Sequence, residues 1–267
     1  CRDQPGRQMS KTLTRALTGV TVFTLAMTGC AGGDSQPHSS PAASGPSGDL
    51  IVLAAASLQK PFNDLAMKFT EQYPNISVKY SFDGSSGLVD QMKGGAQADV
   101  FASADEKNMT KAIDAGLVDS SKLFATNTLV LAVQKGNPGK ITGLDSSLDD
   151  KKLVICAPEV PCGNATKKLA EQLGYTLKPV SEELKVTDVL GKVANKEVDA
   201  GLVYKTDAAS NNKVDAVEVK GAENVVNKYP VAVTKMSKHQ DAAQAYVDYV
   251  LSAEGVKILE GYGFGKP

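Results

Sequence analysis

Small hydroxyl residues follow two segments of the sequence that have strand patterns. Ser57 comes two positions after the apolar residues 50–55, and Ser85 and Ser86 come after the alternating residues 76–82. A helix N-terminus carries free N–H groups and a partial positive charge. Two such termini with added hydroxyl groups can together hold an anion. Each serine taken alone is also typical of an ordinary helix N-cap.

Catalytic arrangements have little support in this sequence. His38 and His239 are not next to a plausible nucleophile, which argues against a Ser–His–Asp triad. Residues 84–87 read Gly-Ser-Ser-Gly and do not match the Gly-x-Ser-x-Gly nucleophile elbow. The sequence has no Walker loop, no dinucleotide fingerprint and no His/carboxylate metal cluster. We therefore expect a binding protein that is not an enzyme and that needs no cofactor.

The elements that would position these turns alternate between strand and helix. Alternating or apolar runs predict strands, whereas apolar residues at helical spacing predict helices. This alternation favours α/β architecture with mainly parallel sheets. The strand patterns lie at residues 50–55, 76–82, 99–103, 128–133, 153–157, 200–204, 216–219 and 229–233, and the helix patterns at 57–69, 88–93, 106–115, 165–173, 188–194 and 241–259.

The N-terminal part has the pattern of a lipoprotein export signal. Lys11 and Arg15 precede the apolar residues 17–27, a stretch shorter than the about 20 residues that span a bilayer. Cys30 then predicts a lipidated first residue of the mature chain outside the cytoplasm, although Met27 departs from the usual Leu and a signal cut without lipid is the alternative. We assign residues 1–29 to an upstream extension and this signal. Residues 30–49 lack large apolar side chains and predict a flexible tether of roughly 25 Å.

Two cysteines remain in the part predicted to fold. Cys156 and Cys162 are close in sequence, and in an oxidising compartment such a pair is more often a disulfide than a metal site. The formal net charge is −1, so no basic excess indicates nucleic-acid binding. We expect a monomer.

Six short motifs carry a family resemblance that extends over about residues 50–264. The motifs are residues 54–58 (AAASL), 81–88 (SFDGSSGL), 95–105 (GAQADVFASAD), 160–163 (VPCG), 201–204 (GLVY) and 262–264 (YGF). With these motifs the chain resembles the molybdate-binding proteins of ABC importers. The resemblance implies a two-lobed type II periplasmic-binding-protein fold, in which each lobe is a mainly parallel sheet flanked by helices. Two crossing strands would join lobe I, residues 50–128 and 231–267, to lobe II, residues 129–230.

The resemblance also implies a ligand and its contacts. Molybdate or tungstate would receive hydrogen bonds from the hydroxyl and backbone N–H groups of Ser57 and Ser85. Cys162, which replaces the family's usual alanine, and Val186 would each donate a backbone N–H, and Tyr204 would donate its phenol. Without the resemblance, core packing would be the preferred interpretation of Val186 and Tyr204. An ABC permease with its ATPase would receive the oxyanion.

One residue next to these turns departs from the family pattern. Asp83 stands where the family usually has a small residue, and a carboxylate beside a dianion is repulsive. Asp83 would either accept a backbone N–H and point away, or accept a proton from hydrogen phosphate. We expect Asp83 and Ser86 to lie next to the residues that contact the ligand without contacting it themselves. The alternatives are a binding protein for phosphate or sulfate, and an anion-sensing receptor module.

Overall fold

The computed structural model describes residues 45–267. The predictions for the signal segment and for Cys30 lie outside the described residues. The tether was expected to reach residue 49, but the first strand already begins at Gly48. Among residues 45–267, no helix is both long enough and apolar enough to cross a lipid bilayer.

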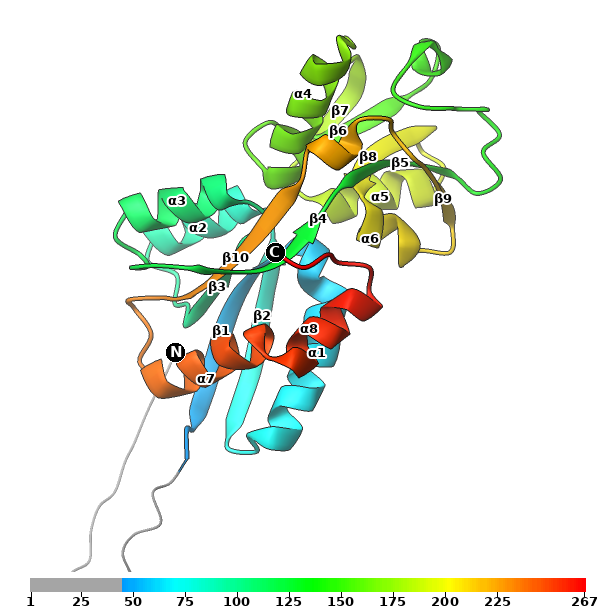
Figure 1. Cartoon of the computed structure of the whole chain (residues 1–267). Coiled ribbons are helices and arrows are strands. Elements are labelled where there is room, and N and C mark those ends of the chain that lie inside the picture. Colours follow the sequence, from blue (N-terminus) through cyan, green and yellow to red (C-terminus); the bar gives the residue numbers. More distant parts are fainter. Residues whose placement is uncertain (1–44) are drawn as a thin grey trace, which may run out of the picture. The chain divides into compact units, whose positions relative to one another are not determined.

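The first sheet has the strand order β2-β1-β3-β10-β4 and is covered by helices on both faces (Figure 1). Alternate residues of β1 point to opposite faces, so Val52 packs in the core under α1 and α7 while Leu53 packs under α2 and α3. The strands are β1 (Gly48–Ala55), β2 (Ile76–Asp83), β3 (Val100–Ala102), β4 (Lys122–Asn127) and β10 (Asn227–Val233), and the helices are a 3-10 turn (Ala56–Leu58), α1 (Gln59–Gln72), α2 (Ser85–Lys93), α3 (Glu106–Asp114), α7 (Gln240–Leu251) and α8 (Ala253–Gly261).

The second sheet has the order β7-β6-β8-β5-β9. Its central strands β5, β6 and β8 are almost entirely buried, and helices α4, α5 and α6 pack against them (Figure 1). The elements are β5 (Leu129–Gln134), 3-10 turn Ser146–Leu148, β6 (Leu153–Cys156), α4 (Pro161–Leu173), β7 (Pro179–Glu183), α5 (Val186–Ala194), β8 (Ala200–Tyr204), α6 (Lys205–Ala209), β9 (Val214–Val217) and 3-10 turn Ala222–Asn224.

The chain passes between the sheets at two places that lie side by side. It leaves the first sheet after Asn127, the end of β4, and enters the second at Leu129. It returns at Asn227, which is paired in register with Asn127. Residues 227–230 therefore lie in the first sheet, and their assignment to lobe II was wrong.

The two-lobed α/β architecture is confirmed, but its sheets are mixed. In each sheet, two of the strand pairings are parallel and two are antiparallel. The parallel pairs come from strands joined through helices within one lobe. The antiparallel pairs involve β10 and β5, each the first strand after a crossing, which enter their sheets in the opposite direction.

Several element boundaries differ from the sequence patterns. Helices α2, α4 and α5 begin two to four residues earlier than predicted, so that Ser85, Pro161 and Val186 are their first residues. The single helix predicted over residues 241–259 is two helices, because the Ser252 hydroxyl accepts the N–H of Gly255 at 3.2 Å and caps α8. Strands β4 and β7 and helix α6 were not predicted.

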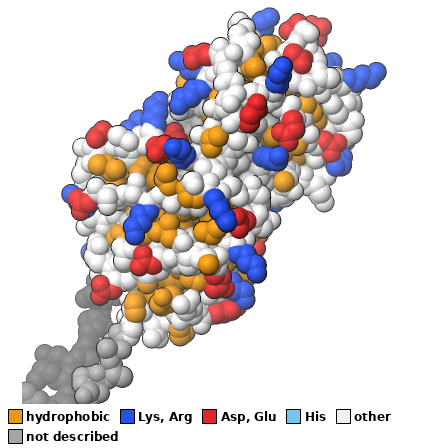
Figure 2. Space-filling model, in the orientation of Figure 1, with side chains coloured by type: hydrophobic (Ala, Val, Ile, Leu, Met, Phe, Trp, Pro, Cys, Tyr) orange, Lys and Arg blue, Asp and Glu red, His pale blue; other side chains and the backbone are white. Residues whose placement is uncertain are grey.

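The surface agrees with the near-zero net charge. Figure 2 shows basic and acidic side chains interspersed over the face in view, with apolar side chains between them. The exposed ion pairs, such as Lys68–Glu71 at 3.0 Å, contribute little stability because water screens them.

Candidate functional site

Two turns of the first sheet lie side by side because their strands are in register. Ala55 at the end of β1 pairs with Asp83 at the end of β2, and both strands run in the same direction. Ser57 follows β1 within the 3-10 turn, and Ser85 follows β2 as the first residue of α2. Ligand sites in open α/β sheets form at this carboxyl edge of the strands.

Neither serine caps its helix. The N-cap positions are held by Ala55 for the 3-10 turn and by Gly84 for α2, and neither turn has a side-chain cap bond. The N-capping interpretation of Ser57 and Ser85 is therefore wrong. Their hydroxyl groups have other partners: Ser85 Oγ accepts the N–H of Ala104 at 3.0 Å, and Ser57 Oγ lies 3.1 Å from the hydroxyl of Tyr229.

The second sheet supplies two more helix N-termini and a tyrosine. Cys162 lies in the first turn of α4 directly after Pro161, which occupies a position where its missing N–H costs little. Val186 is the first residue of α5, which follows the neighbouring strand β7. Tyr204 ends β8. All three side chains are almost fully buried.

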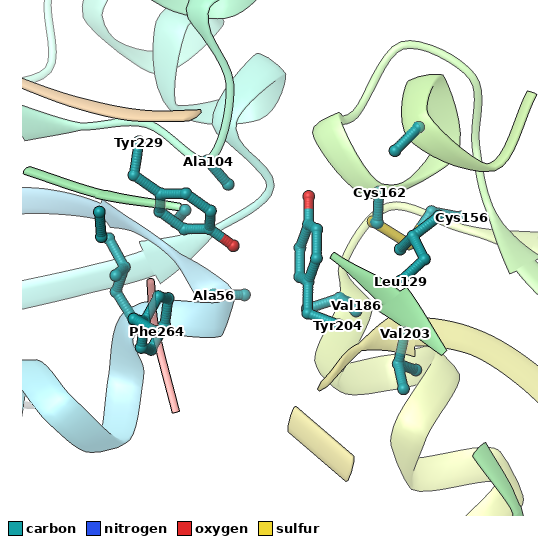
Figure 3. Packing of buried hydrophobic residues seen from close by; sticks show 14 of the residues in the cluster. Ala56, Ala104, Leu129, Cys156, Cys162, Val186, Val203, Tyr204, Tyr229 and Phe264 are labelled. Carbon is teal, nitrogen blue, oxygen red and sulfur yellow. A yellow bond between two sulfur atoms is a disulfide. The ribbon is translucent and has the colours of Figure 1, made fainter. Parts of the chain in front are cut away.

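These turns surround one small pocket with a cavity volume of about 10 Å³. Figure 3 shows Ala56 and Ala104 from the first sheet facing Val186, Tyr204 and Cys162 from the second. Ser57, Ser85, Cys162, Val186 and Tyr204 all line the pocket, and so does Asp83, whereas Ser86 does not. The full lining is Ala55, Ala56, Ser57, Asp83, Gly84, Ser85, Ala104, Val160, Pro161, Cys162, Leu184, Val186 and Tyr204.

The pocket presents hydrogen-bond donors and almost no charge. Its lining contains no lysine or arginine, and Asp83 is its single ionisable carboxylate. The first N–H groups of α2, α4 and α5 have no acceptor inside their own helices, because an α-helix leaves its first four N–H groups free. Three helix N-termini therefore contribute partial positive charge here.

The carboxylate of Asp83 is engaged with its own turn. Asp83 Oδ1 accepts the backbone N–H of Gly84 at 2.8 Å, and Oδ2 accepts the side-chain amide of Gln91 at 3.1 Å. The bond to Gly84 matches one part of the first alternative for Asp83, in which the carboxylate accepts a backbone N–H, but Asp83 still lines the pocket and was expected to point away. Both carboxylate oxygens are thereby partly satisfied within the first lobe.

The buried tyrosines beside the pocket are held in their protonated form. Burial raises the pKa of Tyr204 and of Tyr229 above the ordinary tyrosine value, because a phenolate would lose its hydration. The two rings meet edge to face with centroids 5.9 Å apart (Figure 3). Each phenol therefore keeps a proton to donate at neutral pH.

A buried carboxylate lies behind Tyr204. Asp207 Oδ2 accepts the backbone N–H of Tyr204 at 3.2 Å. Burial raises the pKa of Asp207 to about 7, although this bond and the charge of Lys60 lower it in part. Asp207 does not line the pocket, so its role is to hold the end of β8 where Tyr204 projects.

The two lobes touch beside the pocket at Gly84. A methyl group on this residue would lie 2.2 Å from the backbone oxygen of Leu184 and 3.0 Å from a methyl carbon of Val160. Gly84 belongs to the α2 turn of the first lobe, and Leu184 and Val160 belong to the second. Only a residue without a side chain permits this approach.

The predicted disulfide is confirmed. Cys156 at the end of β6 is bonded to Cys162 in the first turn of α4, with their Cα atoms 5.7 Å apart. The bond closes the loop that carries Val160 and Pro161 to the pocket wall. Within residues 45–267, no group of three or more His, Cys, Asp or Glu side chains could hold a metal ion.

Sequence reasoning missed Ala104 in the pocket lining and Tyr229 and Asn227 behind it. All three contact the pocket hydroxyls, and Tyr229 and Asn227 lie outside the six family motifs. A polar residue at the start of a buried strand, as Asn227 is, was the only available signal.

Known proteins resemble this chain over most of its length. Residues 50–265 match the family described as bacterial extracellular solute-binding protein. The molybdate-binding protein ModA of Mycobacterium tuberculosis is 44% identical over 241 residues, covering 88% of this chain and 92% of the relative. The putative ABC transporter substrate-binding lipoprotein YvgL of Bacillus subtilis is 31% identical over 257 residues, covering 93% of this chain and 96% of the relative.

A solved structure shares the fold. The periplasmic molybdate-binding protein of Azotobacter vinelandii superposes with a TM-score of 0.73 at 23% identity, covering 82% of this chain and 99% of that one. The fold, the turns that meet at one pocket and the family match over residues 50–265 lead to one conclusion. This chain belongs to the bacterial extracellular solute-binding proteins.

Proposed function

We propose that this protein binds molybdate, and also tungstate, outside the cytoplasm and delivers it to an ABC importer. The observation that carries this proposal is a pocket of neutral donors at three helix N-termini, with no basic side chain in its lining. A fully deprotonated tetrahedral dianion only accepts hydrogen bonds, so such a pocket matches it. The 44% identity to a molybdate-binding protein supports this choice of anion.

Five residues would make the direct contacts. The hydroxyl groups of Ser57, Ser85 and Tyr204 would each donate one hydrogen bond to an oxygen of the anion. Cys162 and Val186 would donate their backbone N–H groups, which do not depend on the side chain. The family alanine can therefore be a cysteine here without loss of a contact.

The competing ligand is another tetrahedral oxyanion. Sulfate is also fully deprotonated at neutral pH, so the same donors suit it and only the size of the pocket discriminates. Hydrogen phosphate carries a proton that needs an acceptor. Asp83 is the one carboxylate in the lining, and its bonds to Gly84 and Gln91 make it a poor acceptor for that proton.

The proposal is tested by the double variant Ser57→Ala, Ser85→Ala. Thermal unfolding is followed with and without excess molybdate, because a ligand that binds only the folded state raises the melting temperature. We expect a clear rise for the wild-type protein and little or none for the double variant. A wild-type protein that molybdate and tungstate both fail to stabilise would contradict the proposal.

We further propose that Cys30 anchors the protein to the membrane through a lipid. The pattern of residues 11–30 supports this, and the similar YvgL protein is a putative lipoprotein. Expression of the full chain with a radiolabelled fatty acid should label the protein and place it in the membrane fraction. The variant Cys30→Ser should lose the label, and an unlabelled wild-type protein would refute the anchor.

A further inference from the structure

Asn227 joins the two lobes directly behind the pocket. It is the first residue of β10, where the chain returns to the first sheet, and it is 6% exposed. Its side-chain nitrogen donates to the backbone oxygen of Ala104 at 2.9 Å and to the hydroxyl oxygen of Tyr204 at 3.0 Å. Ala104 follows β3 in the first sheet, whereas Tyr204 ends β8 in the second.

The direction of these bonds is fixed by chemistry. A backbone carbonyl only accepts hydrogen bonds, so the group that faces Ala104 must be the NH₂ of the Asn227 amide. The same NH₂ group faces Tyr204, and the phenol oxygen must therefore accept. The phenol proton consequently cannot point at Asn227 and is left for another acceptor.

Ala104, which accepts the Asn227 amide, also fixes the direction of a second hydroxyl group, that of Ser85. The N–H of Ala104 donates to Ser85 Oγ at 3.0 Å, and an N–H can only donate. The Ser85 proton is therefore also left for another acceptor. Both hydroxyl groups line the pocket, so a bound anion can accept both protons, in competition with the Tyr229 hydroxyl for the proton of Tyr204.

We propose that Asn227 is a positioning residue for the anion: it presents the Tyr204 hydroxyl to the pocket as a donor, and it does so from the opposite lobe. This inference rests on the proposed function and deepens it. It explains why a buried amide stands at the crossing. With Asn227 in place, the pocket favours ligands that accept hydrogen bonds, because the bond from Asn227 leaves the Tyr204 proton free to be donated.

A double-mutant cycle tests the inference, with molybdate affinity measured by isothermal titration calorimetry. The variants are Asn227→Leu, which has a similar shape without the donor, Tyr204→Phe, and the two combined. We expect Asn227→Leu to weaken affinity about 10-fold in the wild-type background, and less than about 2-fold when Tyr204 is already Phe. An equal loss in both backgrounds, or no loss in either, would overturn the inference.

Loss of packing is separated by a matched control. Asn127 lies opposite Asn227 in register, is 5% exposed, and donates to Thr206 Oγ1 at 2.8 Å; it lies beside the Tyr229 hydroxyl but does not bond to Tyr204. Asn127→Leu should lower the melting temperature to a similar degree, yet its effect on affinity should be the same with Tyr204 or Phe at position 204. If Asn127→Leu and Tyr204→Phe are coupled as strongly as Asn227→Leu and Tyr204→Phe, then any substitution at the crossing affects Tyr204. That result would refute a specific role for Asn227.

Failure of the inference can be told from failure of the proposed function. If the wild-type protein binds molybdate and the cycle is additive, the function stands and the role of Asn227 is wrong. If it binds sulfate or phosphate but not molybdate, the cycle is run with that anion. If it binds none of these, the function and the inference both fail.

Discussion

At the scale of single residues, the pocket combines proton donors whose directions are set by the groups behind them. Ser85 receives the Ala104 N–H, and Tyr204 receives the Asn227 amide. A hydrogen bond to a charged group contributes about 1.5–3 kcal/mol, more than a bond between neutral groups. Each hydroxyl should therefore have a measurable effect on affinity for an anion.

Ser85→Ala should weaken molybdate binding about 10- to 100-fold, because one donor to a charged ligand is lost. The matched control is Ser86→Ala on the same helix turn, since Ser86 does not line the pocket. Calorimetric titration of both variants gives the comparison. Equal affinity in the two variants would show that the Ser85 hydroxyl does not contact the ligand.

The raised pKa of Asp207 predicts how the stability of the protein depends on pH. Its pKa is raised from 3.8 to about 7 by burial, so between these values the unfolded chain releases the proton while the folded chain keeps it. The wild-type contribution of this group to stability is therefore full below about pH 4 and falls as the pH rises towards 7. Asp207→Asn removes this fall, so the stability of the variant relative to wild type should increase across that window.

Urea unfolding at about pH 4.5, 6 and 8 measures this difference. Asp215→Asn is the control, because the pKa of Asp215 is lowered by its bond from Lys135 and has the opposite sign. That variant should show no such increase between pH 4.5 and 8. If the difference in the free energy of unfolding between Asp207→Asn and wild type is the same at all three pH values, the buried carboxylate does not titrate in this range.

The limits of sequence reasoning at this scale are physical. Ser57, Ser85 and Tyr204 could be found because each ends or follows a strand inside a family motif. Tyr229 and Asn227 could not, because their roles arise only when the return strand meets other turns in the fold: Tyr229 contacts Ser57, 172 positions away, and Asn227 bridges Ala104 and Tyr204, 123 and 23 positions away. Hydrogen bonds across such distances leave no local pattern.

At the scale of elements, the site depends on how three helix N-termini approach one another. Strong apolar runs such as β1, β5 and β8 could be predicted because burial on both faces requires them. Strand β7 could not, since its residues Pro179–Glu183 are half-buried or exposed at the edge of the sheet and three of the five are polar. Helix α6 has five residues, too few to show helical periodicity.

Gly84→Ala should weaken anion binding without unfolding either lobe. The backbone of Gly84 has φ −60° and ψ 138°, which alanine adopts freely, but the added methyl group would collide with Leu184 of the other lobe. The lobes would then close less completely on the ligand. Gly87→Ala is the control, because a methyl there meets Asp83 at an ordinary 3.6 Å.

Small-angle X-ray scattering with and without molybdate tests this, together with calorimetry. Wild type and Gly87→Ala should contract on binding, and Gly84→Ala should contract less and bind more weakly. Wild-type affinity in Gly84→Ala would show that the contact with Leu184 is not needed for closure.

The disulfide should stiffen the α4 turn of the pocket. A bridge across a loop this short constrains the unfolded chain by about 2 kcal/mol, and it also holds the N-terminus of α4 in place. Reduction, verified by mass spectrometry, should lower the melting temperature and weaken molybdate binding several-fold through lost preorganisation. If the reduced protein is less stable but binds molybdate with unchanged affinity, the disulfide contributes to stability and not to ligand binding.

At the scale of the whole molecule, two mixed sheets form two lobes, and the proposed anion pocket is lined by residues of both. The chain joins the two lobes only at the crossings at residues 127–129 and near Asn227, within the described residues 45–267. The two-lobed architecture was predictable from the order of strand and helix patterns and the family motifs. The mixed strand directions were not, because they follow from where the chain re-enters each sheet.

The most direct test of the central claim is calorimetric titration of the wild-type protein with molybdate, tungstate, sulfate and phosphate in turn. This claim predicts tight binding of molybdate and tungstate with one site per chain, weaker binding of sulfate, and the weakest binding of phosphate, whose proton would meet only Asp83, a carboxylate already bonded to Gly84 and Gln91. Tight binding of phosphate with none of molybdate would contradict it.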